Sequence, residues 1–579
     1  MTEAFRVWAP QRRRVELVAG GRRHPMERMD RGWWDAGGVA AEPGMRYGYS
    51  LDGADVRPDP RSPSQPDGVF GLSEVVDHGA YAWHDGAWRG LPLAGSVIYE
   101  LHVGTFSSKG TFAGVIEHLP HLVELGVEAV EVMPVAEFAG NRGWGYDGVD
   151  LFAPHHAYGG PEGLKRLVDA CHSAGLGATL DVVYNHLGPA GNFLAEFGPY
   201  FSDRHRTEWG SALNFDAAGS DEVRRFIVDN ALMWIRDYHF DGLRLDAVHA
   251  IVDQTPVHVL EQLAVEAEAL GEVLHRTVFL VAESDLNEPR LVRSRDAGGY
   301  GLEAAWSDDW HHSLHAALTG EKTGYYRDFG PLAHLRKALR QAWVYDGVWS
   351  EHRQRTRGRK AAGIGSHRFV IAIQNHDQVG NRAQGDRLAA TIDEGRLQAA
   401  AALLLTSPFT PMLFQGEEWA ASTPFQYFTD FADLDLGRAV RDGRREEFAA
   451  FGWNREVPDP QDPATFERSK LDWGETSEPA HASMLEWYRA LIRLRRRLPA
   501  PRDPAGEGVM VEIDDALRRI VFEREGVSVR VNLGEEDWNL TIPSGFKLAA
   551  ASEGIDRSRG GLRLPPSGVA VLEGEGDDG

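Results

Sequence analysis

Eight short apolar segments constrain the fold more than any other feature of the chain. They alternate with helical patterns, and nearly all end in polar or charged side chains. Stretches rich in Val, Leu and Ile that alternate with helices are typical of parallel strands buried on both faces. Eight such units predict an α/β fold, a TIM barrel, whose active site lies at the C-terminal ends of the strands. The segments are residues 96–106, 129–135, 177–186, 242–248, 278–284, 303–309, 369–377 and 411–418.

Helical patterns between these segments support the same fold. Apolar residues recur at spacings of three and four in residues 114–126, 162–175 and 221–239. Gly126 and Gly175 follow the periodic residues, where a glycine that ends a helix is expected. A doubly wound open sheet would show the same alternation. The absence of a glycine-rich phosphate turn and the polar ends of at least five segments favour a closed barrel.

Length and local composition divide the chain into three parts. A chain of 579 residues is too long for one core. Residues 1–94 contain short alternating runs broken by Gly, Pro and Asp, which predict an N-terminal β-sandwich. We assign residues 95–500 to the barrel with its loop insertions. The alternating runs of residues 501–579 predict a C-terminal β-sandwich.

Charge and cysteine content restrict the partners and the compartment. The chain has 86 Asp and Glu against 61 Lys and Arg, a net charge of -25, which opposes binding to nucleic acid or an anionic membrane. A neutral ligand is more compatible with this negative charge than an anionic partner is. The single cysteine, Cys171, suggests a reducing compartment. Because we find no apolar run of about 20 residues and no apolar core of a signal peptide, we expect a cytoplasmic protein.

Two acidic residues at neighbouring strand ends suggest glycoside cleavage. Asp246 and Glu283 end the expected fourth and fifth strands. Adjacent strands lie ~4.8 Å apart, so the two carboxyl groups can lie about 5–5.5 Å from each other, as in retaining glycosidases. Glu283 follows an apolar run, and burial beside other carboxylates would raise its pKa and suit it to act as the acid. Arg244, on the same strand face as Asp246, can keep that carboxylate ionised.

Asp377 ends the seventh segment, across the expected barrel mouth, where it could bind sugar hydroxyls. Any one of these acids alone could equally be solvated or structural. A non-catalytic glycan-binding protein on the same scaffold is the alternative outside the enzymes. Such a protein is expected to have lost one or more of the acids, and all three are present here.

Four motifs resemble the signature segments of α-amylase-type glycoside hydrolases, in the same order and on the expected strands. They are DVVYNH (181–186), DGLRLDAVH (241–249), VAES (281–284) and QNHDQ (374–378). The resemblance implies Asp246 as nucleophile, Glu283 as general acid/base and Asp377 as the aspartate that stabilises the transition state. It also implies sugar contacts from Tyr146, His186, Arg244 and His376, and a position for His249 on the side of the leaving group.

Within that superfamily the chain is most similar to the maltooligosyltrehalose trehalohydrolase family. The similarity is carried by YNHLGPAGN (184–192), AESDLNEPR (282–290), DDWHHSLH (308–315) and QNHDQVGNRAQGDR (374–387). It implies hydrolysis of the α-1,4 bond beside a terminal trehalose, with maltooligosyltrehalose and related α-glucans as partners. We include Asp285, Gln378 and Arg382 of these motifs among the expected substrate-binding residues.

Branching and debranching enzymes share the three acids and are the alternative within the superfamily. We expect no cofactor and no required metal. Asn185 matches a calcium-ligand position of some α-amylases, but residues 187–214 contain no obvious set of carboxylates for a hard cation.

Overall fold

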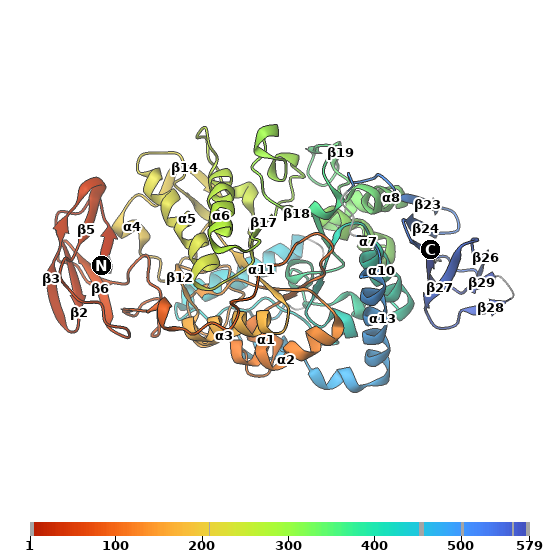
Figure 1. Cartoon of the computed structure of the whole chain (residues 1–579), viewed down its shortest axis with the longest axis horizontal. Helices are drawn as coiled ribbons and strands as arrows, with labels where there is room; N and C mark the ends of the chain where they lie inside the picture. Colours follow the sequence, from red (N-terminus) through yellow and green to blue (C-terminus); the bar gives the residue numbers. More distant parts are fainter. Residues whose placement is uncertain (1–4, 208, 451–456, 500–502, 559–560, 575–579) are drawn as a thin grey trace.

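Three parts lie along the long axis of the molecule (Figure 1). N-terminal sheets form one end, the barrel lies in the middle, and C-terminal sheets form the other end. The structure is a computed structural model and describes residues 5–207, 209–450, 457–499, 503–558 and 561–574. The boundary expected between residues 500 and 501 lies outside the described residues.

The central part is a closed barrel of eight parallel strands. Its order is β9-β10-β13-β16-β17-β18-β21-β22, and β22 pairs with β9. Every residue in these strands is buried, which explains why they appear in the sequence as continuous apolar runs. Seven strands lie within their expected segments and β22 begins one residue before its segment, so the predicted barrel is confirmed. The strands are β9 (Ile98–Leu101), β10 (Ala129–Val132), β13 (Gly177–Val182), β16 (Gly242–Leu245), β17 (Phe279–Ala282), β18 (Ala304–Trp306), β21 (Phe369–Ala372) and β22 (Thr410–Phe414).

Helices surround the barrel, and three of them match the expected ranges. The Thr111 side chain accepts a hydrogen bond from the backbone N–H of Gly114 at the start of α2, and Gly126 ends α2 with a left-handed φ of 98°. None of the helices in the described part of the chain is long and apolar enough to cross a membrane. The main helices are α2 (Phe112–Leu125), α3 (Gly160–Ser173), α5 (Ser220–Asp237), α6 (Val259–Leu274), α7 (Asp308–Thr319), α8 (Leu332–Gln341), α9 (His376–Gly380), α10 (Glu394–Thr406) and α13 (Pro479–Arg495).

The N-terminal part consists of antiparallel sheets in the orders β1-β5-β4 and β3-β2-β6-β7, with β8 also pairing with β6. Aromatic side chains form much of their core, among them Trp34 and Tyr49. On the barrel side, the Trp33 indole N–H donates to Glu222 Oε2 of α5 at 3.1 Å. The strands are β1 (Arg6–Trp8), β2 (Val15–Ala19), β3 (Arg22–Pro25), β4 (Glu27–Arg28), β5 (Trp33–Asp35), β6 (Arg46–Leu51), β7 (Val56–Arg57) and β8 (Ser73–Glu74).

The C-terminal part consists of a five-stranded sheet, β23-β24-β25-β30-β27, and a three-stranded sheet, β26-β29-β28. Its attachment explains why α10 is apolar on all sides, since this helix packs against β25 and β30 as well as the barrel. The strands are β23 (Met510–Asp514), β24 (Arg519–Arg524), β25 (Val527–Asn532), β26 (Trp538–Thr541), β27 (Phe546–Ala551), β28 (Asp556–Ser558), β29 (Gly561–Leu564) and β30 (Val569–Gly574).

Two buried arginines satisfy the carbonyl groups at the C-terminal end of α10. Arg495 of α13 donates to Leu405 O at 3.0 Å and to Ser407 O at 2.9 Å. Arg524 of β24 donates to Thr406 O at 2.5 Å. The last carbonyls of a helix have no partner within it, so these guanidinium groups join the barrel, α13 and the C-terminal sheet at one point.

Replacement of Gly242 tests the packing of the fourth barrel strand. A Cβ atom at this position would lie 2.3 Å from Cε2 of the Phe279 ring. We expect Gly242→Ala to lower the free energy of unfolding by about 1–3 kcal/mol through overpacking. Thermal and denaturant unfolding would measure the loss. Gly86→Ala is the control, because a Cβ there meets nothing within 4 Å. Equal stability of the two variants would contradict the expectation.

Candidate active site

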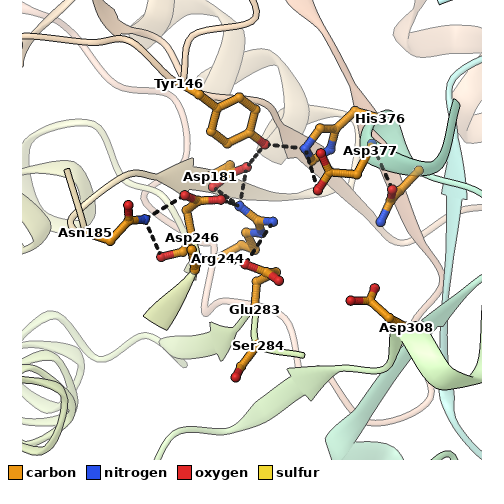
Figure 2. A network of polar contacts seen from close by, with 12 residues as sticks. Tyr146, Asp181, Asn185, Arg244, Asp246, Glu283, Ser284, Asp308, His376 and Asp377 are labelled. Atoms are coloured by element: carbon orange, nitrogen blue, oxygen red, sulfur yellow. Dashed lines mark hydrogen bonds and ion pairs between the residues drawn. The ribbon is translucent and has the colours of Figure 1, made fainter. Parts of the chain in front are cut away.

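The three expected acids converge at the mouth of the barrel (Figure 2). Asp246 follows β16, Glu283 follows β17, and Asp377 lies in α9, shortly after β21. Adjacent parallel strands end at the same edge, so residues distant in sequence meet there. Arg244 of β16 lies at the centre of the group, and the acids are arranged around its guanidinium.

The Arg244 side chain is fully buried and links three carboxylates. Its Nη1 donates to both carboxylate oxygens of Asp181 at 2.9 Å and to Oδ1 of Asp246 at 2.7 Å. Its Nη2 lies 3.9 Å from Oε2 of Glu283. The guanidinium carbon also lies 4.3 Å from the centre of the Trp306 ring. Burial opposes the charge, but Asp181 and the other nearby acids outweigh it and raise the pKa of Arg244 well above its usual value.

Asp246 is held as a hydrogen-bond acceptor on both carboxylate oxygens. Arg244 donates to Oδ1, and the Asn185 amide donates to Oδ2 at 2.7 Å and to the backbone oxygen of Asp246 at 2.9 Å. Both donors favour the ionised carboxylate. The side chain remains 12% exposed, so it can be reached from the mouth.

Glu283 has surroundings that favour its protonated form. Burial, followed by the nearby charges of Asp246 and other acids, raises the pKa of Glu283 well above its usual value, although Arg244 acts in the opposite direction. The backbone N–H of Ala247 donates to Oε2 at 2.6 Å. Among the described residues, no hydrogen bond involves Oε1. The proton therefore belongs on Oε1, where it can be donated to a ligand.

A chain of hydrogen bonds connects the barrel interior to this site. Glu100 Oε1 lies 2.5 Å from His376 Nδ1, and His376 Nε2 lies 2.7 Å from the Tyr146 hydroxyl. The hydroxyl donates to Asp181 Oδ2 at 2.5 Å. Burial acts to lower the pKa of His376, but the charges of Asp377 and Glu100 act more strongly in the opposite direction. The pKa of His376 is therefore raised to about 9. A protonated His376 donates at both nitrogens, which leaves the Tyr146 proton for Asp181.

Asp377 differs from the other two acids in its exposure. Its side chain is 47% exposed, and its Oδ2 lies 3.5 Å from His376 Nε2. The Asn381 amide donates to Oδ1 at 3.3 Å. The carboxylate thus lies at the open side of the mouth, where hydroxyl groups of a sugar can reach it.

The two remaining expected histidines lie beside this centre. His186 is buried, forms a hydrogen bond with Asn185, and stacks on Trp209 with ring centres 5.1 Å apart. Trp209 is 49% exposed and therefore offers an aromatic surface near the mouth. His249 is exposed in the short 3-10 helix Val248–Ala250, which follows the turn after Asp246.

Asp285, Gln378 and Arg382 are engaged mainly with other protein groups. Asp285 pairs with Arg353 at 2.5 Å and Arg357 at 2.8 Å, and these two arginines outweigh burial and lower its pKa. Arg382 pairs with Glu321 at 3.1 Å. Gln378 caps the start of α9 through Asn375 and donates to Asp308 Oδ1 at 3.3 Å.

Sequence analysis did not select Glu100, Trp306, Trp209 or Asp308 as site residues. Glu100 could have been found, because a charged residue inside a strand buried on both faces requires a partner. Asp308 lies inside the sixth expected segment, two residues after the end of β18. The two tryptophans gave no such signal, because most tryptophans pack in cores.

One cluster of possible metal ligands is present within the part of the chain that the structure describes. It consists of Glu137, His155 and His156, whose ligand atoms lie within 4.8 Å of one another. Glu137 accepts hydrogen bonds from the backbone N–H of His156 at 2.8 Å and from its Nδ1 at 2.7 Å. These contacts satisfy the carboxylate without an ion.

Comparison with known proteins identifies the family. An alpha amylase catalytic domain model matches residues 66–209, and a domain of unknown function, DUF3459, matches residues 504–571. A malto-oligosyltrehalose trehalohydrolase of Arthrobacter ramosus is 50% identical over 99% of this chain and 100% of its own length. One of Mycobacterium tuberculosis is 49% identical over 98% of both chains. The chain belongs to the malto-oligosyltrehalose trehalohydrolase family.

Solved structures agree with this membership. A Salmonella typhimurium protein assigned as an alpha amylase is 39% identical and matches with a TM-score of 0.90 over 98% of this chain and 97% of its own. A pullulanase of Paenibacillus barengoltzii matches with a TM-score of 0.71 at 20% identity, over 98% and 93% of the two chains. The second likeness shows the fold alone.

The raised pKa of His376 predicts how its contribution to stability changes with pH. Its pKa is about 9 in the folded protein, above the ordinary histidine value of 6.5, so the protonated ring stabilises the fold fully below pH 6.5. This contribution is lost as the pH rises toward 9, by up to about 1.4 kcal/mol per pKa unit. We expect His376→Gln to destabilise the protein more at pH 6 than at pH 9.5, as measured by denaturant unfolding.

His24→Gln, on the outer strand β3, is the control for His376→Gln. It should give the same small change at both pH values. A loss of stability from His376→Gln that does not depend on pH would show that the ring is not held protonated.

Proposed function

We propose that the chain is a retaining glycoside hydrolase that cleaves the α-1,4 bond beside the terminal trehalose of maltooligosyltrehalose and releases trehalose. The names of its relatives support the substrate. One observation carries the chemistry: both carboxylate oxygens of Asp246 accept hydrogen bonds, from Arg244 and Asn185, while the pKa of the neighbouring Glu283 is raised well above its usual value by burial. Retaining glycosidases require such a pair of carboxyl groups in opposite states.

In this proposal, Asp246 attacks the anomeric carbon of the sugar beside the scissile bond. Arg244 and Asn185 orient its carboxylate, so that little reorganisation is needed on the way to the transition state. The attack breaks the bond to the departing oxygen and leaves a covalent glycosyl-enzyme with inverted configuration.

Glu283 transfers the proton in both steps. Its Oε1 gives the proton to the departing oxygen, and Oε2 is held by the backbone N–H of Ala247. The resulting carboxylate then removes a proton from water, which attacks the glycosyl-enzyme and restores the original configuration. The nearby carboxylates raise the affinity of Glu283 for a proton and so allow this group to act as an acid near neutral pH.

Asp377, His376 and Tyr146 would hold the sugar while charge develops on it. Asp377 offers a partly exposed carboxylate to the hydroxyl groups, and such contacts accelerate the reaction when they are stronger in the transition state than in the ground state. Tyr146 stacks on His376 with ring centres 5.1 Å apart, which fixes both rings at the mouth. His186 and Arg244 complete the proposed contacts to this sugar, and His249 lies on the proposed side of the leaving group.

Transfer of the glycosyl group to a sugar hydroxyl is the second candidate, as in branching enzymes. A 1,4-alpha-glucan branching enzyme of Vibrio parahaemolyticus is 36% identical, but the match covers only 53% of this chain and 46% of that enzyme. The full-length matches favour hydrolysis over transfer. We also propose a cytoplasmic location, on the basis of the single cysteine, Cys171.

The first functional prediction concerns the substrate and the products. Trehalose should be released from maltooligosyltrehalose much faster than maltose from a maltooligosaccharide of equal length, as measured by chromatography of the sugars. NMR should show the new reducing end first as the α-anomer, because retention requires it. Equal rates on the two substrates, branched products, or an initial β-anomer would each argue against the proposal.

The second functional prediction separates the roles of the two carboxyl groups. Asp246→Asn and Glu283→Gln should each lower kcat by several orders of magnitude without unfolding the protein. α-Glucosyl fluoride needs little protonation of its leaving group, so Glu283→Gln should still form the glycosyl-enzyme. Added azide should then restore turnover in Glu283→Gln, because it replaces the water that needs a base.

Asp246→Asn serves as the matched comparison, since it also exchanges one carboxylate for an amide. It should gain nothing from azide with the same fluoride, because it lacks the nucleophile. Rescue of neither variant, or equal reaction of both with the fluoride, would show that the two roles are assigned incorrectly.

A further inference from the structure

A further carboxyl group, that of Asp308, lies in the mouth and has no part in the proposed chemistry. Asp308 is the first residue of α7 and lies two residues after the end of β18. In the barrel, β18 lies between β17, which leads to Glu283, and β21, which leads to Asp377. Figure 2 shows the Asp308 carboxyl group directed toward Glu283 and Asp377, and the residue is partly exposed.

The next residue, Asp309, shows what a structural carboxylate looks like at this place. Asp309 Oδ2 accepts hydrogen bonds from the Asn287 amide at 2.7 Å and from the backbone N–H groups of Val344 at 2.6 Å and Tyr345 at 2.7 Å. These contacts join the start of α7 to two other loops. Asp309 therefore already provides the structural connection, and Asp308 is not needed for it.

Asp308 has far weaker support from the protein. Its hydrogen bond among the described residues comes from the Gln378 amide and reaches only Oδ1, at 3.3 Å. Burial and then the charge of Asp377 raise the pKa of Asp308 to about 7. Burial of a carboxyl group among other acids costs free energy unless hydrogen-bond donors reach its oxygens. Asp308 is partly exposed, so donors that belong to a ligand can reach it.

The barrel order places Asp308 on the side of the departing sugar. Asp246, Glu283 and Asp308 follow three consecutive barrel strands, β16, β17 and β18, so Asp246 and Asp308 lie on opposite sides of Glu283. In the proposed mechanism, Asp246 contacts the sugar that becomes attached to the enzyme. Glu283 protonates the oxygen at the scissile bond. A group on the far side of Glu283 from Asp246 can face the sugar that leaves, whereas Asp377 reaches back to the attached sugar from α9 beside His376.

We infer that Asp308 binds hydroxyl groups of the departing trehalose and is a specificity-determining residue for it, with Gln378 as its positioning residue. This inference rests on the proposed function. Neighbouring hydroxyl groups of a sugar can donate to the two oxygens of one carboxylate, which matches the single weak bond that the protein supplies. The anionic form is the better acceptor, and the α7 N-terminus favours it.

Inhibition by trehalose, the released product, tests the contact directly. Asp308→Ala should weaken inhibition by trehalose about ten- to a hundredfold, the range for loss of a hydrogen bond to a charged group. It should lower kcat/KM for maltooligosyltrehalose by a similar factor. Hydrolysis of α-glucosyl fluoride, which has no departing sugar, should change less than about threefold.

Two further variants guard against loss of the fold and non-specific effects. Asp308→Asn keeps the shape of the side chain and should weaken inhibition by trehalose in the same direction, even if Asp308→Ala unfolds. Asp221→Asn removes an exposed carboxylate at the start of α5 and should leave all three measurements unchanged.

Two results would overturn the inference. Unchanged inhibition by trehalose in a folded Asp308 variant, with the alkaline limb of the pH profile displaced, would mean that Asp308 acts only through the pKa of Glu283. Equal losses on maltooligosyltrehalose and the fluoride would mean a general structural role. If the unaltered protein releases trehalose, either result refutes only the role of Asp308. If it does not, the proposed function itself is refuted.

Discussion

The buried guanidinium of Arg244 is the group on which the arrangement of the site depends. Parallel pairing of β13 and β16 sets Asp181 directly beside Arg244, so both side chains point to the same side of the barrel wall. The charge is tolerated because Asp181 and Asp246 accept from it and Trp306 covers its face. Loss of one partner in such a buried group leaves the other charge uncompensated, which typically costs about 3–5 kcal/mol.

The same cation gives two neighbouring acids different properties. Its short contact is with Asp246, at 2.7 Å, and its contact with Glu283 is long, at 3.9 Å. Burial and the nearby negative charges therefore outweigh Arg244 at Glu283, and the pKa of Glu283 is raised. We propose that this difference in the contacts of one guanidinium separates the carboxylate that attacks from the carboxyl group that donates a proton.

The sequence was sufficient for the barrel and for the acids at its mouth, because both follow from short-range patterns. Buried strands must be apolar, and a carboxylate that directly follows such a strand has to lie at its end. It was not sufficient for Asp285, whose arginine partners Arg353 and Arg357 come from a segment about 70 residues later. Nor did it reveal the pairing of Arg382 with Glu321. Loop-to-loop ion pairs leave no periodic signal, so only the folded arrangement reveals them.

The place of Tyr146 depends on close contacts that only glycine allows. Its loop runs between β11 (Ala136–Glu137) and β12 (Asp150–Pro154) and includes Gly145, which has a φ of 98°. A Cβ on Gly145 would lie 2.2 Å from Pro134 O, and one on Gly380 would lie 2.1 Å from the Trp144 ring. Trp144 in turn donates to Gln426 O at 2.9 Å. The loop is therefore pressed against α9, the helix that begins with His376, and this contact brings the tyrosine hydroxyl within reach of both His376 and Asp181.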